Sequence, residues 1–183
     1  MAKGLLGQRL VRVHRGKRTA GIIVEAEAYL GVVDRAAHTF GGRRTDRNES
    51  MWRGGGHAYV YFTYGIHYLM NVVAGKTEQP VAVLIRALEP VEGFKTMHRR
   101  RKKARHDRDL CSGPAKLTQA MAIDRHLDSI DLVTSPKMFI EKLRGRAFSA
   151  SHISAGPRVG IDYAGDWKDK PLRFYIKDNP YVS

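Results

Sequence analysis

Residues 21–38 read GIIVEAEAYLGVVDRAAH, and this stretch predicts the strand around which the rest of the chain is organised. In an extended strand, alternate side chains point to opposite faces. One face would be apolar and able to pack on a core; it contains Ile22, Val24, Ala26, Ala28 and Leu30. The other would set two carboxylates beside an aromatic ring; it contains Glu25, Glu27 and Tyr29.

Gly31 ends this strand, and residues 34–38 are expected to form a turn or short helix that folds back over it. A carboxylate beside an aromatic ring suits a site that holds a flat molecule and activates a water molecule. The alternative is a half-exposed strand with a solvated charged face, and the stretch taken alone favours that alternative.

Composition limits the class of protein. The 183 residues suit one domain with a sizeable core. Hydrophobic residues make up 43% of the chain, but none of its stretches approaches the ~18 apolar residues of a membrane span. The first residues carry Lys3, Arg9 and Arg12, so no apolar signal sequence is expected. A single cysteine, Cys111, excludes a disulfide framework within the chain and fits a reducing cytoplasm.

The charge balance indicates a partner. Thirty-two Lys and Arg against 18 Asp and Glu give a net charge of +14, so nucleic acid is the leading partner class. A membrane surface is the second choice, disfavoured because no basic amphipathic helix with bulky apolar residues stands out. The basic run at residues 99–108 is expected to be a solvated, mobile segment.

The chain in order predicts an α+β fold: a single domain, residues 1–183, around a curved antiparallel β-sheet with flanking helices. Further strands are expected at residues 5–13, 59–63, 66–73, 81–88, 137–143, 158–163 and 171–177. Helices are expected at residues 90–104 and 112–123, with Ser112 as a cap and Pro114 in the first turn. Tyr64 and Gly65 form a hairpin turn, and Thr45 is a candidate helix N-cap.

Two basic residues stand out beyond the charged runs. Arg86 interrupts an apolar strand face, and an unpaired buried charge is costly, so it needs an anionic partner. Either Glu25 or Glu27 would serve. Lys116 lies near the start of the second helix, where it would help to hold a phosphate. An ordinary capped helix is an equally good explanation.

Seven short motifs carry a family resemblance. They are EAEAY at 25–29, AAH at 36–38, YVYFTYG at 59–65, MN at 70–71, IRALEP at 85–90, LCSGPAKL at 110–117 and KPLRFY at 170–175. Together they run in order through nearly the whole chain. On these motifs the chain closely resembles the alkyladenine (3-methyladenine) DNA glycosylase family.

The resemblance implies base excision repair. Enzymes of the family flip a damaged purine out of duplex DNA and hydrolyse its N-glycosidic bond, without a metal, a cofactor or a covalent intermediate. It also implies a role for each matching residue. Glu27 would be the general base and Arg86 its partner beside the water. Tyr29, His38 and Tyr61 would stack on the flipped base. The backbone at Ala36 and His38 and the amide of Asn71 would read its edge. Tyr64 would fill the gap in the duplex, and Arg43 and Thr45 would contact phosphates.

Without the resemblance, the choice between Glu25 and Glu27 stays open, because both point the same way in a regular strand. The pocket residues so assigned include no lysine able to form a Schiff base, so a monofunctional enzyme without lyase activity is expected. The family usually has an additional N-terminal helix that is missing here or cut to a few residues.

Double-stranded DNA with damaged purines is therefore the expected partner of a monomeric enzyme. It would be cytoplasmic and nucleoid-associated in a bacterium, or nuclear in a eukaryote. The competing hypothesis is a basic nucleic-acid-binding module without catalysis. That hypothesis explains the charge and the tyrosines, but it gives no reason for a buried pair between Glu27 and Arg86.

Overall fold

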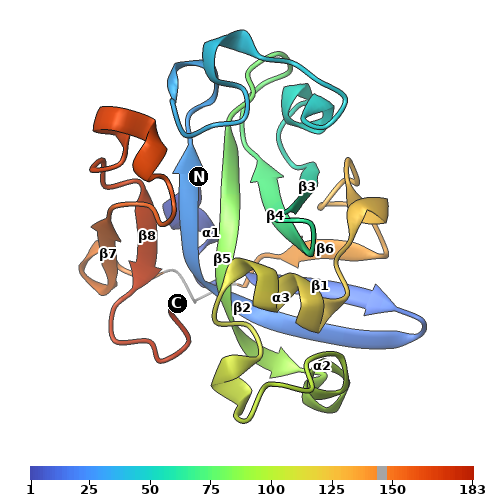
Figure 1. Ribbon diagram of the computed structural model, residues 1–183. Coiled ribbons are helices and arrows are strands. Elements are labelled where there is room, and N and C mark those ends of the chain that lie inside the picture. Colours follow the sequence, from blue (N-terminus) through green and yellow to red (C-terminus); the bar gives the residue numbers. More distant parts are fainter. Residues whose placement is uncertain (144–147) are drawn as a thin grey trace.

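One antiparallel sheet contains the eight strands of residues 1–143 and 148–183, the part of the chain that this computed structural model describes. The strand order is β3-β4-β5-β2-β1-β6, with β8 added to β2 and β7 added to β8 (Figure 1). The strands are β1 (Arg9–His14), β2 (Lys17–Tyr29), β3 (Ala58–Thr63), β4 (His67–Val73), β5 (Ala82–Glu92), β6 (Met138–Glu141), β7 (Ile153–Gly156) and β8 (Arg173–Ile176).

Helices are few and short in the described residues. The α-helices are α1 (Ala2–Leu5), α2 (Phe94–Arg100) and α3 (Pro114–Met121). The 3-10 turns are η1 (Gly31–Val33), η2 (Phe40–Gly42), η3 (Glu49–Trp52), η4 (Asp107–Asp109), η5 (Arg125–Leu127), η6 (Ala150–His152) and η7 (Asp162–Trp167). The expected α+β fold around an antiparallel sheet is confirmed. No helix in the described part of the chain has the length and apolar character needed to cross a membrane.

Strand β2 is the centre of the sheet. It pairs with β1, with β5 and, near its end, with β8. Glu25 and Glu27 lie where β2 has β5 on one side and β8 on the other, and neither residue is exposed to solvent. The strand is not regular: Ile23 pairs with Leu88 and Glu25 with Ala87, so Val24 is an extra residue, a β-bulge.

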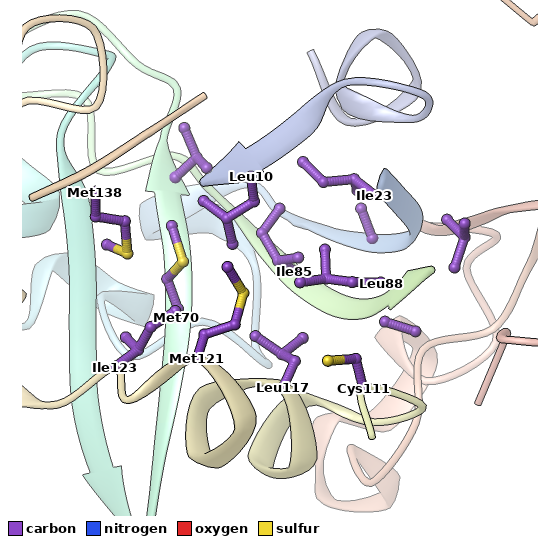
Figure 2. Packing of buried hydrophobic residues seen from close by; sticks show 14 of the residues in the cluster. Leu10, Ile23, Met70, Ile85, Leu88, Cys111, Leu117, Met121, Ile123 and Met138 are labelled. Carbon is purple, nitrogen blue, oxygen red and sulfur yellow. The ribbon is translucent and has the colours of Figure 1, made fainter. Parts of the chain in front are cut away.

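The main core fills the space between the sheet and helices α2 and α3. Figure 2 shows the part of this core that lies against α3. Leu117 and Met121 of α3 pack with Met70 of β4 and Ile85 of β5. Burying four such side chains contributes roughly 1.5–3 kcal/mol each. Thr118 of α3 also donates its hydroxyl to the backbone of β4 at Tyr68 over 2.7 Å. This packing fixes the N-terminal end of α3 beside the β3–β4 hairpin.

Cys111 belongs to the same core. Burial raises the pKa of its thiol to about 12, so the residue is an inert packing group rather than a nucleophile.

Several predicted boundaries were wrong for local reasons. The strand predicted at 81–88 continues to Glu92, so the following helix begins at Phe94 rather than at 90, and it ends at Arg100. The strand predicted at 5–13 begins only at Arg9. The N-cap of α3 is Gly113, with no side-chain cap from Ser112, whereas Pro114 does open the helix.

The predictions for residues 158–163 and for Thr45 were also wrong. Residues 158–163 form no strand, because Gly160 has a φ of +75° and η7 starts at Asp162. Thr45 is not an N-cap: its N–H donates to Oδ1 of Asn48, and Asn48 stands at the N-cap position of η3. The predicted strands at 137–143 and 171–177 are present as the shorter β6 and β8.

Candidate active site

A cavity of about 500 Å³ opens beside the β3–β4 hairpin. Its walls come from the end of β2, residues 36–38, strands β3, β4 and β5, the start of α3 and residues 159–163. Alternation along the strands explains which side chains enter it. Tyr59, Tyr61 and Thr63 of β3 face the cavity, as do His67, Leu69 and Asn71 of β4. Each set shares one face of its strand, as alternation along an extended strand requires.

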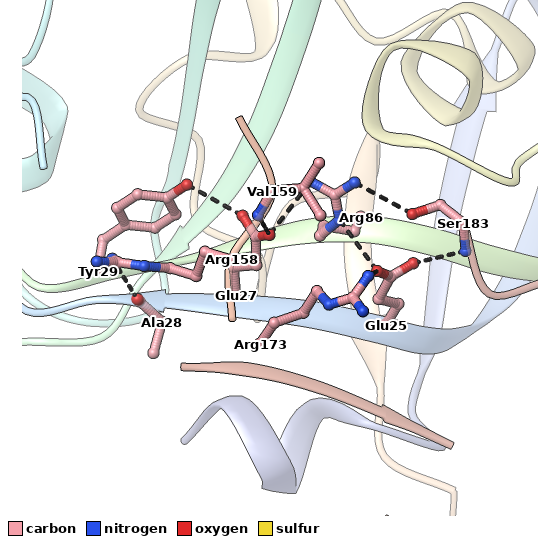
Figure 3. Close-up of polar contacts among 9 residues, drawn as sticks. All are labelled: Glu25, Glu27, Ala28, Tyr29, Arg86, Arg158, Val159, Arg173 and Ser183. Carbon is pink, nitrogen blue, oxygen red and sulfur yellow. Dashed lines mark hydrogen bonds and ion pairs between the residues drawn. The ribbon is translucent and has the colours of Figure 1, made fainter. Parts of the chain in front are cut away.

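Glu27 has no exposed surface. Figure 3 shows the groups that hold its carboxylate. Its Oε1 accepts from the backbone N–H of Val159 at 2.8 Å and lies 3.2 Å from Nη1 of Arg86. Its Oε2 accepts from the hydroxyl of Tyr29 at 3.0 Å. Val159, Arg86 and Tyr29 all line the cavity, so every group that holds this carboxylate is itself in the wall.

The protonation of Glu27 is a balance between burial and its partners. Burial raises the pKa of the carboxyl group, the Arg86 guanidinium and the hydrogen bonds lower it, and burial dominates, so the pKa lies above its usual range. The sequence predicted Arg86 as a partner of Glu27, and the two side chains are paired in the structure. Arg86 does oppose protonation, but the enclosure of β2 between two strands is the larger effect.

Glu25 points to the same side of β2 but is held differently. Its Oε1 accepts from Nε of Arg86 at 3.1 Å and from Nη1 of Arg173 at 3.0 Å. Its Oε2 accepts from the backbone N–H of Ser183 at 2.8 Å. Of these three partners only Arg86 lines the cavity. The geometry therefore places Glu27, rather than Glu25, next to the cavity, and it gives Arg86 both of the anionic partners considered.

Three aromatic side chains form one wall. Tyr59 and Tyr61 are stacked with ring centroids 5.2 Å apart, and His38 meets Tyr61 edge-on at 4.6 Å. Nδ1 of His38 lies 2.6 Å from the hydroxyl of Tyr59, a buried partner that the sequence did not single out. Burial and the neighbouring Arg47 and Arg43 lower the pKa of His38 to about 4, so its ring is neutral at neutral pH.

Residues 34–38 are fixed by a buried ion pair. Asp34 binds Arg158 through two contacts of 2.6 and 2.9 Å, and both side chains are fully buried. Asp34 also accepts from the backbone N–H groups of Leu30 and Ala36. The amide N–H of Ala36 is thus already bonded, and it is the carbonyl of Ala36 that remains on the cavity side, 3.5 Å from the hydroxyl of Tyr163.

Asn71 of β4 is also part of the cavity wall. It is 4% exposed, and its Nδ2 donates to the backbone carbonyl of Tyr59 at 3.2 Å. Its amide is therefore oriented by the neighbouring strand.

Tyr64 stands at the cavity mouth. It has a φ of +51° in the hairpin turn, and 85% of its surface is exposed. A positive φ is uncommon for a residue with a bulky side chain. The predicted turn at Tyr64 and Gly65 is present, closed by a hydrogen bond from the N–H of Ile66 to the carbonyl of Thr63.

Arg43 and Thr45 do not line the main cavity. They line a smaller cavity of about 90 Å³ together with Arg47, Asn48, His38 and Tyr59. Because His38 and Tyr59 belong to both cavities, this basic cluster lies directly behind the aromatic wall. Arg47 places its guanidinium over the ring of Tyr61, 5.3 Å from the centroid.

Comparison with known proteins decides the family. Residues 1–180 match the profile of the methylpurine-DNA glycosylase (MPG) family. The chain belongs to this family. The putative 3-methyladenine DNA glycosylase of Natranaerobius thermophilus is 46% identical over 185 residues, covering 100% of this chain and 92% of the relative. The corresponding protein of Clostridium acetobutylicum is 48% identical over 190 residues, with 91% of its length covered.

The DNA-3-methyladenine glycosylase of Homo sapiens is 44% identical over 193 residues, and here the match covers 100% of this chain but 63% of the relative. The methylpurine-DNA glycosylase resemblance inferred from seven motifs is therefore confirmed. It supports a DNA glycosylase of base excision repair over the non-catalytic binding module.

Within this methylpurine-DNA glycosylase chain, the geometry corrects one expectation about lysine. Lys116 lines the cavity, so the expectation that no lysine lies among the pocket residues was wrong. Lys116 projects from the first turn of α3, is exposed, and donates to Oγ of Ser112 at 3.3 Å. Lys116 reaches the cavity because α3 packs on β4, and this packing brings the N-terminal end of α3 to the cavity mouth.

Sequence reasoning also missed several groups that shape the site. They are the N–H of Val159, the Asp34–Arg158 pair, Tyr59 and Tyr163. A backbone N–H has no sequence signature. The alternation Val159, Ile161, Tyr163 suggested a strand, which concealed the loop that reaches Glu27.

Proposed function

We propose that this protein flips alkylated or deaminated purines out of duplex DNA and hydrolyses the N-glycosidic bond, leaving an abasic site. The observation that carries the proposal is the carboxylate of Glu27 behind the wall of an aromatic-lined cavity, held by Arg86, Val159 and Tyr29. A purine nucleotide in the cavity would present its sugar carbon to this carboxylate.

Glu27 would act twice. Departure of the purine leaves an oxocarbenium-like sugar, and water attacks it well only if a carboxylate accepts its proton. The negative charge of Glu27 would also stabilise the developing positive charge on the sugar. Arg86 and the N–H of Val159 fix the orientation of the carboxylate, so little reorganisation is required during the reaction.

The cavity suits a positively charged base. Alkylated purines such as 3-methyladenine are cationic leaving groups, and the faces of Tyr29 and Tyr61 attract cations. His38 is neutral at neutral pH because its pKa is about 4, so it adds no repulsion. The carbonyl of Ala36, the backbone at His38 and the amide of Asn71 would read the edge of the base. Hypoxanthine, a neutral base, would need protonation by a further acid.

Flipping costs a few kcal/mol of lost stacking and pairing. Stacking on aromatic rings returns roughly 1–3 kcal/mol per base contact. Tyr64, exposed at the mouth, would occupy the space that the base leaves in the duplex. Arg43, Thr45 and Lys116 would contact backbone phosphates, and the net charge of +14 would add sequence-independent attraction.

We further propose that the enzyme is monofunctional and uses water, with no metal or cofactor. Lysines that form Schiff bases are activated by desolvation or by a cationic neighbour. Lys116 is exposed and bonded to a serine hydroxyl, which gives it neither activation. A monomer is expected, acting at the bacterial nucleoid or in the eukaryotic nucleus.

A single assay tests the proposal. Duplex oligonucleotides containing hypoxanthine or ethenoadenine, and methylated DNA, are incubated with the protein and then treated with alkali. Strand cleavage at the lesion only after alkali is the expected result. Tight binding to these duplexes with no base released from any of them would overturn the proposal in favour of the non-catalytic module.

A further inference from the structure

Glu25 has no role in the reaction described so far, although it is a fully buried charge beside the site. Two carboxylates, Glu25 and Glu27, and two guanidinium groups, Arg86 and Arg173, form one connected network on β2, β5 and β8 (Figure 3). The two positive charges of Arg86 and Arg173 are balanced only when both carboxylates, Glu25 and Glu27, are counted. Leaving one member of a buried ionic network without its partner is costly, so both carboxylates matter to the two arginines.

Arg86 is shared between the two carboxylates. Its Nε donates to Oε1 of Glu25 at 3.1 Å, while its Nη1 lies 3.2 Å from Oε1 of Glu27. An isolated arginine–carboxylate pair commonly forms two parallel hydrogen bonds. Here each carboxylate contacts one nitrogen of the guanidinium, and the third, Nη2, donates to Oγ of Ser183 at 3.1 Å, so Arg86 does not form a two-bond pair with Glu27.

We propose that Glu25 is a positioning residue, which draws Arg86 toward itself so that Glu27 keeps a single guanidinium contact and remains basic enough to activate water. This inference rests on the proposed function and deepens it. Without the pull of Glu25, the guanidinium would be free to pair fully with Glu27 and to cover the oxygen that the water needs.

Charge works in the same direction as geometry. The negative charge of Glu25 raises the pKa of Glu27, in addition to the larger effect of burial. Arg173, 20% exposed at its side chain, pairs with Glu25 and moderates that charge. Removing Glu25 or Arg173 should therefore move the pKa of Glu27 in opposite directions.

The groups facing Glu27 come from several elements. They are Tyr29 and Glu25 on β2, Arg86 on β5, Arg173 on β8, the N–H of Val159, Arg158 with its partner Asp34, and Tyr61 on β3. Arg158 is already paired with Asp34 through two hydrogen bonds. Among these groups, Glu25 and Arg173 can each be neutralised without removing a direct partner of Glu27.

The test compares Glu25→Gln and Arg173→Gln with the wild-type enzyme. Single-turnover excision of a lesion duplex is measured with enzyme in excess over a range of pH. Glu25→Gln should slow excision by up to about 100-fold and move the acid limb of the profile to lower pH. Arg173→Gln should move the acid limb to higher pH. Glu92→Gln removes a carboxylate from the partly exposed pair with Arg18, an ion pair of the sheet separate from that of Glu27, and should change neither the rate nor the acid limb.

A titration that does not depend on activity separates this inference from the proposed function. The carboxyl carbon of Glu27 is followed by NMR in glutamate-labelled protein, with Glu27→Gln assigning the signal. Opposite shifts of its pKa in the two variants support the positioning role even in a protein that excises nothing. If the wild type excises the base but neither variant shifts the acid limb of the pH profile or the NMR titration of Glu27, Glu25 is only structural. If Glu25→Gln does not fold, an unmoved titration in Arg173→Gln, the more exposed change, overturns the positioning role in the same way.

Discussion

The backbone N–H of Val159 donates a 2.8 Å hydrogen bond to Oε1 of Glu27, although 132 positions separate the two residues. The bond joins the centre of the sheet to a loop that is itself fixed by the buried Arg158–Asp34 pair. Orientation of the proposed base thus depends on three segments: β2, the loop after it, and residues 158–161.

Replacement of Glu27 by glutamine should abolish catalysis while preserving binding. The amide keeps the shape of the side chain but cannot accept a proton from water, so excision should fall by about 100- to 10,000-fold. Binding to a lesion duplex, measured by fluorescence anisotropy, should change little, because the cavity rings are untouched. Glu49→Gln, on the surface, serves as the matched control. Excision by Glu27→Gln at the wild-type rate would remove Glu27 from the mechanism.

Tyr64→Ala should weaken both lesion binding and excision. The ring is exposed and packs on nothing that the fold requires, so its loss should cost binding rather than stability, about 1–3 kcal/mol. Affinity is measured by anisotropy and flipping by the fluorescence of ethenoadenine. Tyr64→Phe should retain most of the effect, since the ring is kept. Val133→Ala, which also trims an exposed apolar side chain, is the control. Equal affinities for Tyr64→Ala and wild type would refute the wedge role.

Asp34→Asn should destabilise the whole fold. It leaves the buried Arg158 with an uncompensated charge, and breaking such a pair costs roughly 3–5 kcal/mol. Urea unfolding followed by circular dichroism measures the loss. Glu49→Gln, which removes the exposed ion pair with Arg44, should leave the unfolding midpoint almost unchanged. Unfolding of Asp34→Asn at the wild-type midpoint would show that the pair is not structural.

The lowered pKa of His38 predicts that the stability of the fold changes with pH. Its pKa is about 4 in the folded protein, below the ordinary value, so the unfolded chain binds a proton at a pH where the folded protein does not. The stability that depends on neutral His38 is complete above pH about 6.5 and is lost as the pH falls toward 4. His38→Gln should therefore lose less stability than the wild type between pH 7 and 5, by up to about 2 kcal/mol.

The measurement is the free energy of urea unfolding at the two pH values. His126→Gln, at an exposed histidine, should behave like the wild type. If the free energy of unfolding of His38→Gln changed with pH as much as that of the wild type, the folded protein would not hold this ring neutral.

The β3–β4 hairpin shows how much the sequence can predict. Tyr59, Tyr61 and Thr63 alternate along one strand and His67, Leu69 and Asn71 along the next, so the turn and the shared face of each set follow from local rules. That both faces line the cavity depends on tertiary packing. The pairing of Arg86 with the acidic face of β2 was also predictable, because a charge within an apolar alternation requires a partner.

Other features depend on distant contacts and were beyond local rules. The bulge at Val24 places both Ile23 and Val24 in the core, although strict alternation separates them. Residues 158–163 have strand-like alternation, but the Arg158–Asp34 pair and the positive φ of Gly160 impose a loop. The position of Lys116 depends on how α3 packs on β4. In each case a tertiary contact outweighs the local preference.

Lys116 supplies the last prediction, because its position in the cavity wall permits either of two roles. If Lys116 contacts a phosphate, Lys116→Gln should weaken the binding of damaged and undamaged duplex alike. It should also reduce the slope of the logarithm of the binding constant against the logarithm of salt concentration by about 1. As a Schiff-base nucleophile, Lys116 would allow borohydride to trap a covalent complex with DNA. We expect no trapped complex for the wild type, because the amine is exposed and bonded to Ser112. Trapping that disappears in Lys116→Gln would make the enzyme bifunctional, whereas a reduced salt slope without trapping would leave water as the nucleophile and Lys116 as a contact to the DNA backbone.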